Sequence, residues 1–112
     1  MSPKTVREFF DALPGCFRSE AAAGVNAVYQ FDLSGDDGGQ YQLHVADLAC
    51  RVCDGVHAAP NVTLSMEGTD CIAILEGRLS GMSALLNGRL KIAGDMGLAM
   101  QLAAFFPDLR PK

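Results

Sequence analysis

Four cysteines and two histidines are the side chains of this 112-residue sequence best suited to bind a metal or exchange electrons. Cys50 and Cys53 form a Cys-x-x-Cys pair, with His44 and His57 on either side of it. Redox pairs of this type lie at a helix N-terminus, where the pKa of a thiol is lowered, and structural zinc sites add a second compact ligand pair. The segment LACRVCDG instead has the pattern of a strand, in which residues three apart point to opposite faces. We therefore predict buried or incidental thiols and no bound metal, with a metal or redox role as the alternative.

The sequence shows none of the residue constellations that catalysis commonly uses. It has no Gly-x-Ser-x-Gly segment and no phosphate-binding loop, and neither histidine has an evident carboxylate or nucleophile partner. The formal net charge of −4 also differs from the concentrated positive charge of proteins that bind nucleic acids. We therefore expect a protein that is not an enzyme, needs no cofactor and binds no nucleic acid.

The charge is unevenly distributed along the chain. Residues 78–112 carry five cations and two acids, a formal charge of +3, whereas the preceding residues carry four cations and eleven acids, a formal charge of −7. A cationic segment can attract an anionic ligand or a lipid headgroup, which makes Arg89 and Lys91 candidates for such a contact. The alternative is that these side chains are simply solvated.

An amphipathic helix is predicted over residues 3–13, followed by a series of strands. Ser2 is its candidate cap, Pro3 occupies a tolerated first position, and the Pro14-Gly15 pair ends it. From Val25 onward apolar and polar residues alternate, which is typical of a sheet that is wet on one face. Strands are expected over residues 25–33, 40–45, 48–53, 61–67 and 89–94, with a turn at SGDDGG. The predicted covered face carries Tyr29, Phe31, Leu43, Val45, Val52, Leu64 and Ile92.

Three further helices are expected in the second half of the chain. The first runs from a Thr69 cap to Gly77, and the second is capped by Ser80. The last spans residues 96–106, with Gln101 as its single polar side chain. Strands with one apolar face, together with helices to cover that face, predict an α+β domain of about five strands.

The last helix poses a packing problem because it is apolar on every side. Such a helix is expected inside a large core or a membrane. Its eleven residues are far fewer than the ~20 that span a bilayer, and a single small domain has little interior to spare. A plain core is one solution, and a bound ligand or another chain that covers the helix is the other.

Two segments, PNVTLSMEGTDCIAILEG and ALLNGRLKIAGDMGLAMQL, give a specific order of elements. An alternating strand after Pro60 is followed by an acidic turn, an apolar helix, a short strand, and Gly94-Asp95-Met96 before the last helix. In this order residues 60–106 resemble the sterol carrier protein type 2 family of lipid-binding domains, and the earlier residues fit by element order. The resemblance implies a mixed, mostly antiparallel five-stranded sheet whose helical layer encloses a hydrophobic tunnel, in a single domain over residues 1–112.

The resemblance also implies a function, which is to bind and carry or present a fatty acid, fatty acyl-CoA, sterol-like or isoprenoid lipid without chemical change. The expected partners are the lipid, a membrane surface in transient contact, and a second copy in a homodimer. The start of the sequence has no signal-peptide pattern, so a cytoplasmic location is expected. The alternative function is an interaction or accessory module that docks through its apolar C-terminal helix. The candidate ligand-binding residues are Ile72, Leu75, Met82, Leu85, Leu86, Met96, Leu98, Met100, Leu102 and Phe105.

Overall fold

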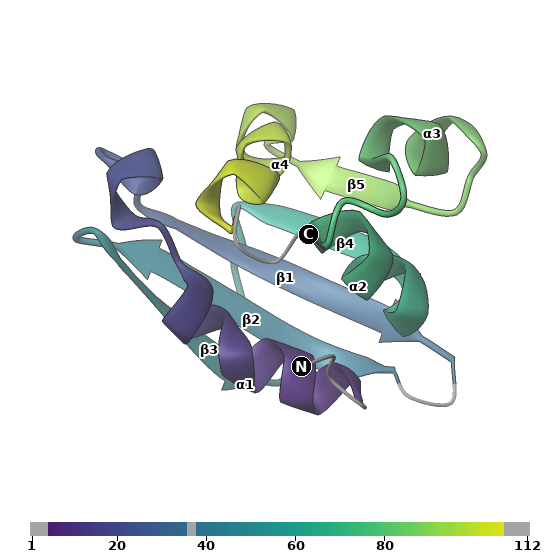
Figure 1. Cartoon of the computed structure of the whole chain (residues 1–112), viewed down its shortest axis with the longest axis horizontal. Helices are drawn as coiled ribbons and strands as arrows, with labels where there is room; N and C mark the ends of the chain where they lie inside the picture. The colour runs from purple at the N-terminus through teal and green to yellow at the C-terminus, as the bar shows by residue number, and fades with distance from the viewer. Residues whose placement is uncertain (1–4, 36–37, 107–112) are drawn as a thin grey trace.

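The structure is a computed structural model that describes residues 5–35 and 38–106. Five strands form one sheet in the order β3-β2-β1-β4-β5, and the helices gather on one of its faces (Figure 1). Only β1 and β4 pair in parallel, and all other neighbours are antiparallel. The predicted α+β class and the mixed, mostly antiparallel sheet are therefore confirmed. The elements are α1 (Val6–Cys16), η1 (Ser19–Ala22), β1 (Ala27–Ser34), β2 (Gly39–Ala46), β3 (Ala49–Asp54), β4 (Val62–Glu67), α2 (Gly68–Leu75), α3 (Gly81–Leu86), β5 (Lys91–Gly94), α4 (Met96–Gln101) and η2 (Leu102–Phe105).

The first helix, α1, begins and ends later than the sequence predicts. The Thr5 side chain caps it by accepting a hydrogen bond from the Glu8 backbone N–H at 3.1 Å, while the predicted cap, Ser2, and Pro3 lie outside the described residues. Pro14 lies inside the last turn rather than ending the helix. A proline there removes one backbone hydrogen bond, and the turn persists because Leu13 and the rest of the apolar face are buried.

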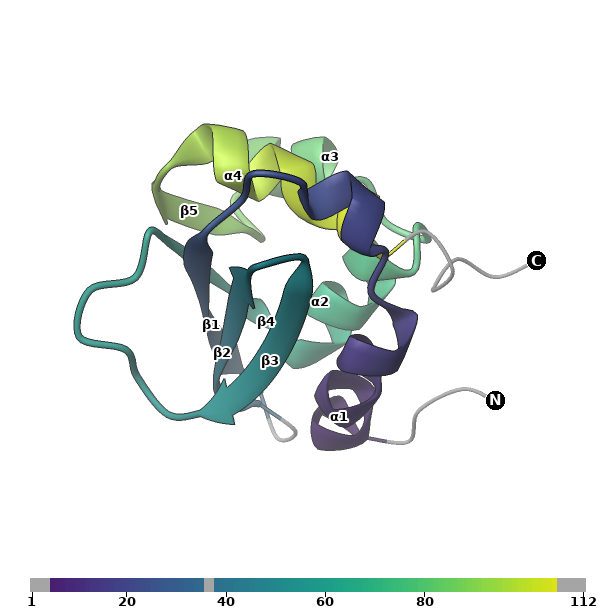
Figure 2. The ribbon, with the colours of Figure 1, turned by 90° about the vertical axis from the view of Figure 1, so that its left-hand side faces the viewer.

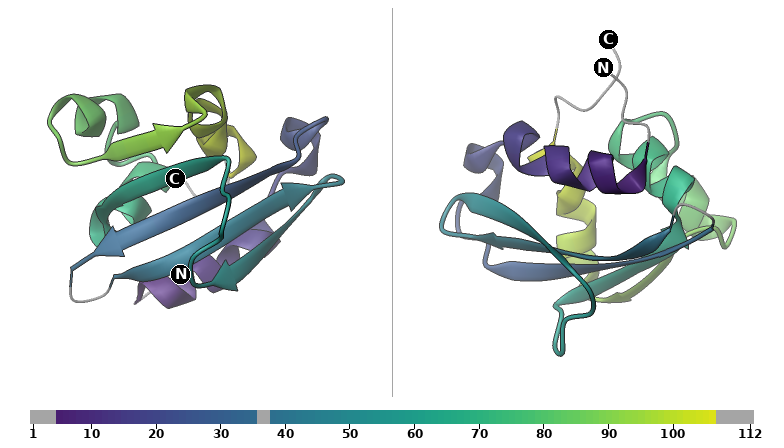
Figure 3. Two further views of the ribbon diagram at one scale, coloured as in Figure 1. Left: turned by 180° about the vertical axis from the view of Figure 1, so that it is seen from behind. Right: turned by 90° about the horizontal axis from the view of Figure 1, so that it is seen from below.

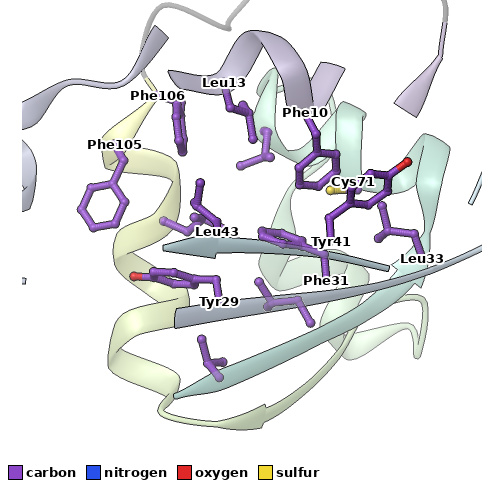
Figure 4. Packing of buried hydrophobic residues seen from close by; sticks show 14 of the residues in the cluster. Phe10, Leu13, Tyr29, Phe31, Leu33, Tyr41, Leu43, Cys71, Phe105 and Phe106 are labelled. Atoms are coloured by element: carbon purple, nitrogen blue, oxygen red, sulfur yellow. The ribbon is translucent and has the colours of Figure 1, made fainter. Parts of the chain in front are cut away.

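The covered face of the sheet carries the side chains that alternation predicts. Tyr29, Phe31, Leu43, Val45 and Leu64 are buried, and Val52 and Ile92 are half-buried against the same core. The predicted register is therefore confirmed. Figure 4 shows Phe10 and Leu13 of α1 lying over Leu43 and Phe31, with Phe105 and Phe106 beside Tyr29 at the other end of the core.

The turn between β2 and β3 is tighter than predicted. Asp47 and Leu48 both have positive φ angles, of 53° and 62°, the backbone conformation that two-residue hairpin turns require. Leu48 was expected to begin the third strand, and the structure instead places it in this turn, exposed to solvent. The strand β3 begins one residue later, at Ala49.

The uncovered face of the sheet is not simply wet. The chain leaves β3 at one edge and crosses behind the sheet before it enters β4 beside β1 (Figures 2 and 3). Gln30 of β1 holds this crossover segment, because its Oε1 accepts from the His57 backbone N–H at 2.8 Å and its Nε2 donates to the Gly55 carbonyl at 3.0 Å. Gln30 is consequently buried on the face that its polar character predicts to be solvated.

The crossover brings together two histidines that the sequence analysis treats as separate. The rings of His44 and His57 lie 5.5 Å apart in an edge-to-face arrangement, and His44 Nε2 lies 2.9 Å from Gln42 Oε1. Burial, Arg51 and His57 together hold the pKa of His44 below its usual 6.5. Protonation of His44 is therefore less favourable in the folded chain than in the unfolded chain.

This shift predicts that part of the acid sensitivity of the fold belongs to His44. Just below pH 6.5 the unfolded chain binds more protons at this residue, so the free energy of unfolding falls as the pH decreases. We expect His44→Gln to lose less stability than the wild type between about pH 7.5 and about pH 5. Urea unfolding of both proteins at the two pH values measures the difference, and equal losses would contradict the assignment.

The cysteines lie apart from one another. Cys50 and Cys53 occupy β3 positions opposite Val45 and Gln42 of β2, and all four cysteines are free thiols. Burial raises the pKa of Cys50 to about 11. Within residues 5–35 and 38–106, no three histidine, cysteine or acidic side chains are grouped so that they could hold a metal ion. Of the helices in the same ranges, none has the length and apolar character that crossing a membrane requires.

Candidate functional site: an apolar cavity under the helices

An apolar cavity of about 430 Å³ lies between the sheet and the later helices. Its volume falls within the ~300–1,000 Å³ of small-molecule sites, which are concave and mainly apolar. The sheet contributes Phe31 from β1, Leu64 and Met66 from β4, and Ile92 from β5. The remaining lining residues are Cys71, Ile74, Leu75, Gly77, Leu79, Ser80, Gly81, Met82, Leu85, Leu90, Ala99, Met100 and Leu102.

The helix α2 supplies one wall because it leaves β4 without an intervening loop. Glu67 ends the strand and is followed directly by helical Gly68, so Thr69 lies inside the helix rather than at the predicted cap position. Cys71 and Leu75 form its buried side toward the cavity. The helix ends at the predicted place, since Gly77 has a φ angle of +80°, which glycine adopts readily after a helix.

The short helix α3 is capped as predicted and covers the outer part of the cavity. The Ser80 side chain accepts from the Ser83 backbone N–H at 3.2 Å. Met82 and Leu85 line the cavity, whereas Leu86 points to solvent and is exposed. The helix therefore divides its apolar side chains between the cavity and the surface.

The last helix is fastened at its start to the sheet. The Asp95 side chain accepts from the Leu98 N–H at 3.1 Å, and the Asp95 N–H donates to the Asn61 carbonyl at 3.0 Å. Glycine is required at position 94, because a Cβ there would collide with the Asn61 backbone. The Tyr29 hydroxyl then donates to the Leu98 carbonyl at 3.0 Å, and burial raises the pKa of this phenol to about 12. These bonds hold α4 over one end of the cavity.

The predicted final helix over residues 96–106 is two elements. The α-helix α4 ends at Gln101, and Leu102–Phe105 form the tighter turn η2. The Arg18 N–H donates to the Phe105 carbonyl at 2.7 Å, so a bond from outside the helix takes one of its last carbonyls. The change of geometry places Leu102 at the cavity and Phe105 in the core beside Phe17.

Half of the ten predicted ligand-binding residues line the cavity, and half lie elsewhere. Leu98 and Phe105, expected to flank Leu102 on the cavity wall, instead pack into the core next to Tyr29 and Phe17. Ile72 also packs against the core, while Leu86 and Met96 are exposed. A helix that is apolar all round gives no sequence signal that separates these three surroundings. The five that line the cavity are Leu75, Met82, Leu85, Met100 and Leu102.

The sheet side of the cavity is missing from the predicted site. Phe31, Leu64 and Ile92 line the cavity, and all three belong to the face whose covering the alternation correctly predicts. Their strand pattern was therefore a usable signal, because a tunnel under a helical layer must have the covered sheet face as its floor. Ala99 had no such signal, since a small side chain contributes little to an apolar pattern.

The cavity is electrostatically quiet. Among its described lining residues, Cys71 alone carries a titratable side chain, and burial raises the pKa of that thiol to about 12. The thiol is therefore protonated at neutral pH and is a poor nucleophile. Ser80 contributes the other polar side chain. Such a lining suits hydrocarbon rather than a charged group.

A separate polar hollow lies beside the start of α2. It is lined by Asp32, Ser34, Ser65, Met66, Glu67, Asp70, Gly88, Arg89 and Lys91. Arg89 makes a two-pronged ion pair with buried Asp70, at 2.7 Å from Nη2 to Oδ1 and 3.2 Å from Nε to Oδ2. Lys91 lies between Leu90 and Ile92, which face the apolar cavity, so its side chain belongs to this other hollow. The expected headgroup contact is thus replaced by a structural ion pair at Arg89 and an acidic setting at Lys91.

This geometry predicts a structural cost when Arg89 is removed. Arg89→Ala should lower the free energy of unfolding by about 1.5–3 kcal/mol, because Asp70 loses charged hydrogen bonds at a buried position. Arg78→Ala is the matched control, since Arg78 pairs with Glu76 at the surface and should cost at most about 1 kcal/mol. Urea unfolding measures both, and equal losses would contradict the structural role of the Asp70 pair.

A family model described as the SCP-2 sterol transfer family matches residues 13–107. The chain belongs to this family. The resemblance stated from the sequence is therefore confirmed, and it extends across α1 and the first three strands, where only element order had suggested it. Membership in the SCP-2 family supports lipid binding as the general function of this domain.

Curated relatives carry the matching segment within longer proteins. Hydroxysteroid dehydrogenase-like protein 2 of Xenopus tropicalis is 32% identical over 108 residues, which are 96% of this chain and 26% of that protein. The mouse protein of the same name is 34% identical over 108 residues, 96% of this chain and 22% of that protein. The chain thus spans about a quarter of the length of these relatives.

Solved structures share the fold of the SCP-2 family. The crystal structure of Sterol Carrier Protein 2 Like 2 from Aedes aegypti is 28% identical with a TM-score of 0.69, over 88% of this chain and 91% of that one. The solution structure of palmitated SCP2L2 from the same organism is 30% identical with a TM-score of 0.66, over 93% of each chain. A sec-alkylsulfatase, Pisa1 from Pseudomonas sp., contains a segment of the same fold at 18% identity and a TM-score of 0.79, over 88% of this chain and 16% of that one.

Proposed function

We propose that this chain binds one lipid with its hydrocarbon portion inside the apolar cavity and releases it chemically unchanged. The observation that carries the proposal is the cavity itself, which is large enough for a small-molecule ligand and is lined almost wholly by apolar side chains. Each methylene group moved from water into such a site stabilises the complex by about 0.8 kcal/mol. The residues proposed to contact the lipid are Leu75, Met82, Leu85, Met100 and Leu102, together with Phe31, Leu64, Ile92 and Ala99.

A fatty acyl chain is the ligand that the observations favour among the fatty acid, fatty acyl-CoA, sterol-like and isoprenoid classes. The Aedes aegypti SCP2L2 structure is described as palmitated, so that relative accepts a fatty acyl chain. In this chain no described lining residue of the cavity is charged, so a carboxylate or CoA headgroup would remain at the opening. Half-exposed Met82 and Met100 mark that opening, where the cavity meets solvent.

The proposal includes no chemistry on the lipid. Its support is the cavity lining, in which the titratable Cys71 thiol is held protonated by burial. The dehydrogenase-like and sulfatase names belong to proteins several times longer than this chain. We further propose that residues 1–112 act as one lipid-binding domain. Transient membrane contact, a homodimer and a cytoplasmic location stay predictions.

Native mass spectrometry of freshly purified protein tests the proposal. We expect a co-purifying mass that extraction identifies as a lipid, and saturable one-to-one binding of a dansyl-labelled fatty acid after delipidation. The alternative is a module that docks other proteins through α4, which leaves Met96 and Met100 exposed. A ligand-free, stable dimer that does not bind the labelled fatty acid would favour that alternative and overturn the carrier proposal.

A further inference from the structure

We propose that Met82 and Met100 form a peroxide-sensitive modification site at the cavity opening, and that their oxidation to sulfoxides lowers lipid affinity. This inference rests on the proposed lipid-binding function. Met82 comes from α3 and Met100 from α4, two elements on different sides of the opening. Both side chains line the cavity, yet their exposed fractions are 50% and 61%. A solvent oxidant and a bound lipid can therefore reach the same two thioethers.

The reaction needs only the thioether and a hydroperoxide. The sulfur lone pair attacks one peroxide oxygen, an S–O bond forms while the O–O bond breaks, and hydrogen peroxide leaves as water. The sulfur is oxidised by two electrons and the peroxide is reduced by two. The product is a methionine sulfoxide, which a sulfoxide reductase can convert back, so the modification is reversible.

Oxidation changes the character of the opening. A methionine side chain is flexible and apolar, which suits a wall that must fit ligands of different shape. A sulfoxide is polar and prefers contact with water to contact with hydrocarbon. Two sulfoxides at the opening would therefore favour water at the place where the lipid chain emerges, and the bound state loses apolar contact that the free state never had.

The other methionines and the thiols provide internal contrasts. Met66 also lines the cavity, but it is only 8% exposed and is protected from a solvent oxidant. Met96 is 44% exposed, but it does not line the cavity, so its oxidation should not change lipid affinity. Burial raises the pKa values of the Cys50 and Cys71 thiols, which reduces their reactivity toward peroxide.

The test compares fatty-acid binding before and after mild peroxide treatment of the delipidated chain. The probe is a dansyl-labelled fatty acid, and each sample is treated with dithiothreitol afterwards, which reverses thiol disulfides but leaves sulfoxides. Intact mass and peptide mapping locate the added oxygen atoms. We expect oxygen at positions 82, 96 and 100 and roughly tenfold weaker binding, with recovery after treatment with sulfoxide reductases.

Leucine variants assign the effect to the opening. Met82→Leu/Met100→Leu should bind the probe before and after peroxide with unchanged affinity, whereas Met96→Leu should lose affinity as the wild type does. Unchanged wild-type affinity after oxidation of positions 82 and 100, or equal losses in both variants, would overturn this inference. A failure of the untreated wild type to bind the probe would instead overturn the proposed function. The double variant also reports folding, since circular dichroism must match the wild type.

Discussion

Replacing Phe10 by alanine is expected to lower the free energy of unfolding by about 3–5 kcal/mol, the largest stability loss that we predict. The Phe10 ring stacks on Tyr41 with centroids 4.4 Å apart and an interplanar angle of 5°, and it meets the Phe31 ring edge-on at 5.1 Å. The side chain is fully buried between α1 and the sheet. Truncation therefore removes a large apolar surface and leaves a space that these rings are too constrained to fill.

Urea unfolding of delipidated protein measures this loss. Val56→Ala is the control for an apolar side chain at the surface, because Val56 is exposed on the crossover segment, and it should change stability by no more than about 0.5 kcal/mol. Phe10 is not among the residues that line the cavity. Folded Phe10→Ala should therefore bind the labelled fatty acid as the wild type does, and a loss near that of Val56→Ala would show that α1 is not part of the core.

Replacing Ala99 by tryptophan is expected to weaken fatty-acid binding by about 100-fold or more, which corresponds to about 2.7 kcal/mol. Ala99 lies on α4 with its side chain at the cavity wall. An indole placed there occupies volume that the lipid would use, so lipid binding must displace it. The empty cavity can accommodate the ring, and the delipidated variant should lose at most about 1–3 kcal/mol of stability.

Ala93→Trp is the matched control for this substitution. Ala93 precedes the same helix by a few residues, is exposed on β5 and does not line the cavity. The measurements are a titration with the labelled fatty acid and a thermal unfolding curve for each delipidated variant. Equal affinities for Ala99→Trp and Ala93→Trp would show that the cavity is not where the lipid binds.

Strand patterns predicted the sheet well because burial on one face fixes the register of every strand. The alternation from Val25 places Tyr29 and Phe31 on the covered face, and a shift of one residue would expose both. The element ends were less predictable. At α1, tertiary packing kept Pro14 inside a helix, and at α2 the direct passage from β4 displaced the expected Thr69 cap.

The apolar helices show why only part of the site could be predicted. Periodicity separates buried from exposed positions when a helix has a polar face, but α4 and η2 have almost none. Leu102 and Phe105 have the same chemical character, and only the bond from Arg18 and the tight final turn send one to the cavity and the other to the core. The Asp70–Arg89 pair was equally hidden, because it joins positions from two elements that no local pattern relates.

The crossover behind the sheet has a consequence for the order in which the protein folds. The strands β1, β2 and β3 are joined by short turns and can pair early, whereas Phe31 of β1 meets Leu64 of β4 only after the intervening chain has passed the sheet. Pairing between distant segments is slow because the loop must close first. Until then β1, the central strand of the finished sheet, is an edge strand with unpaired backbone groups. The nascent chain is therefore most prone to aggregate through β1, in the interval before β4 covers it.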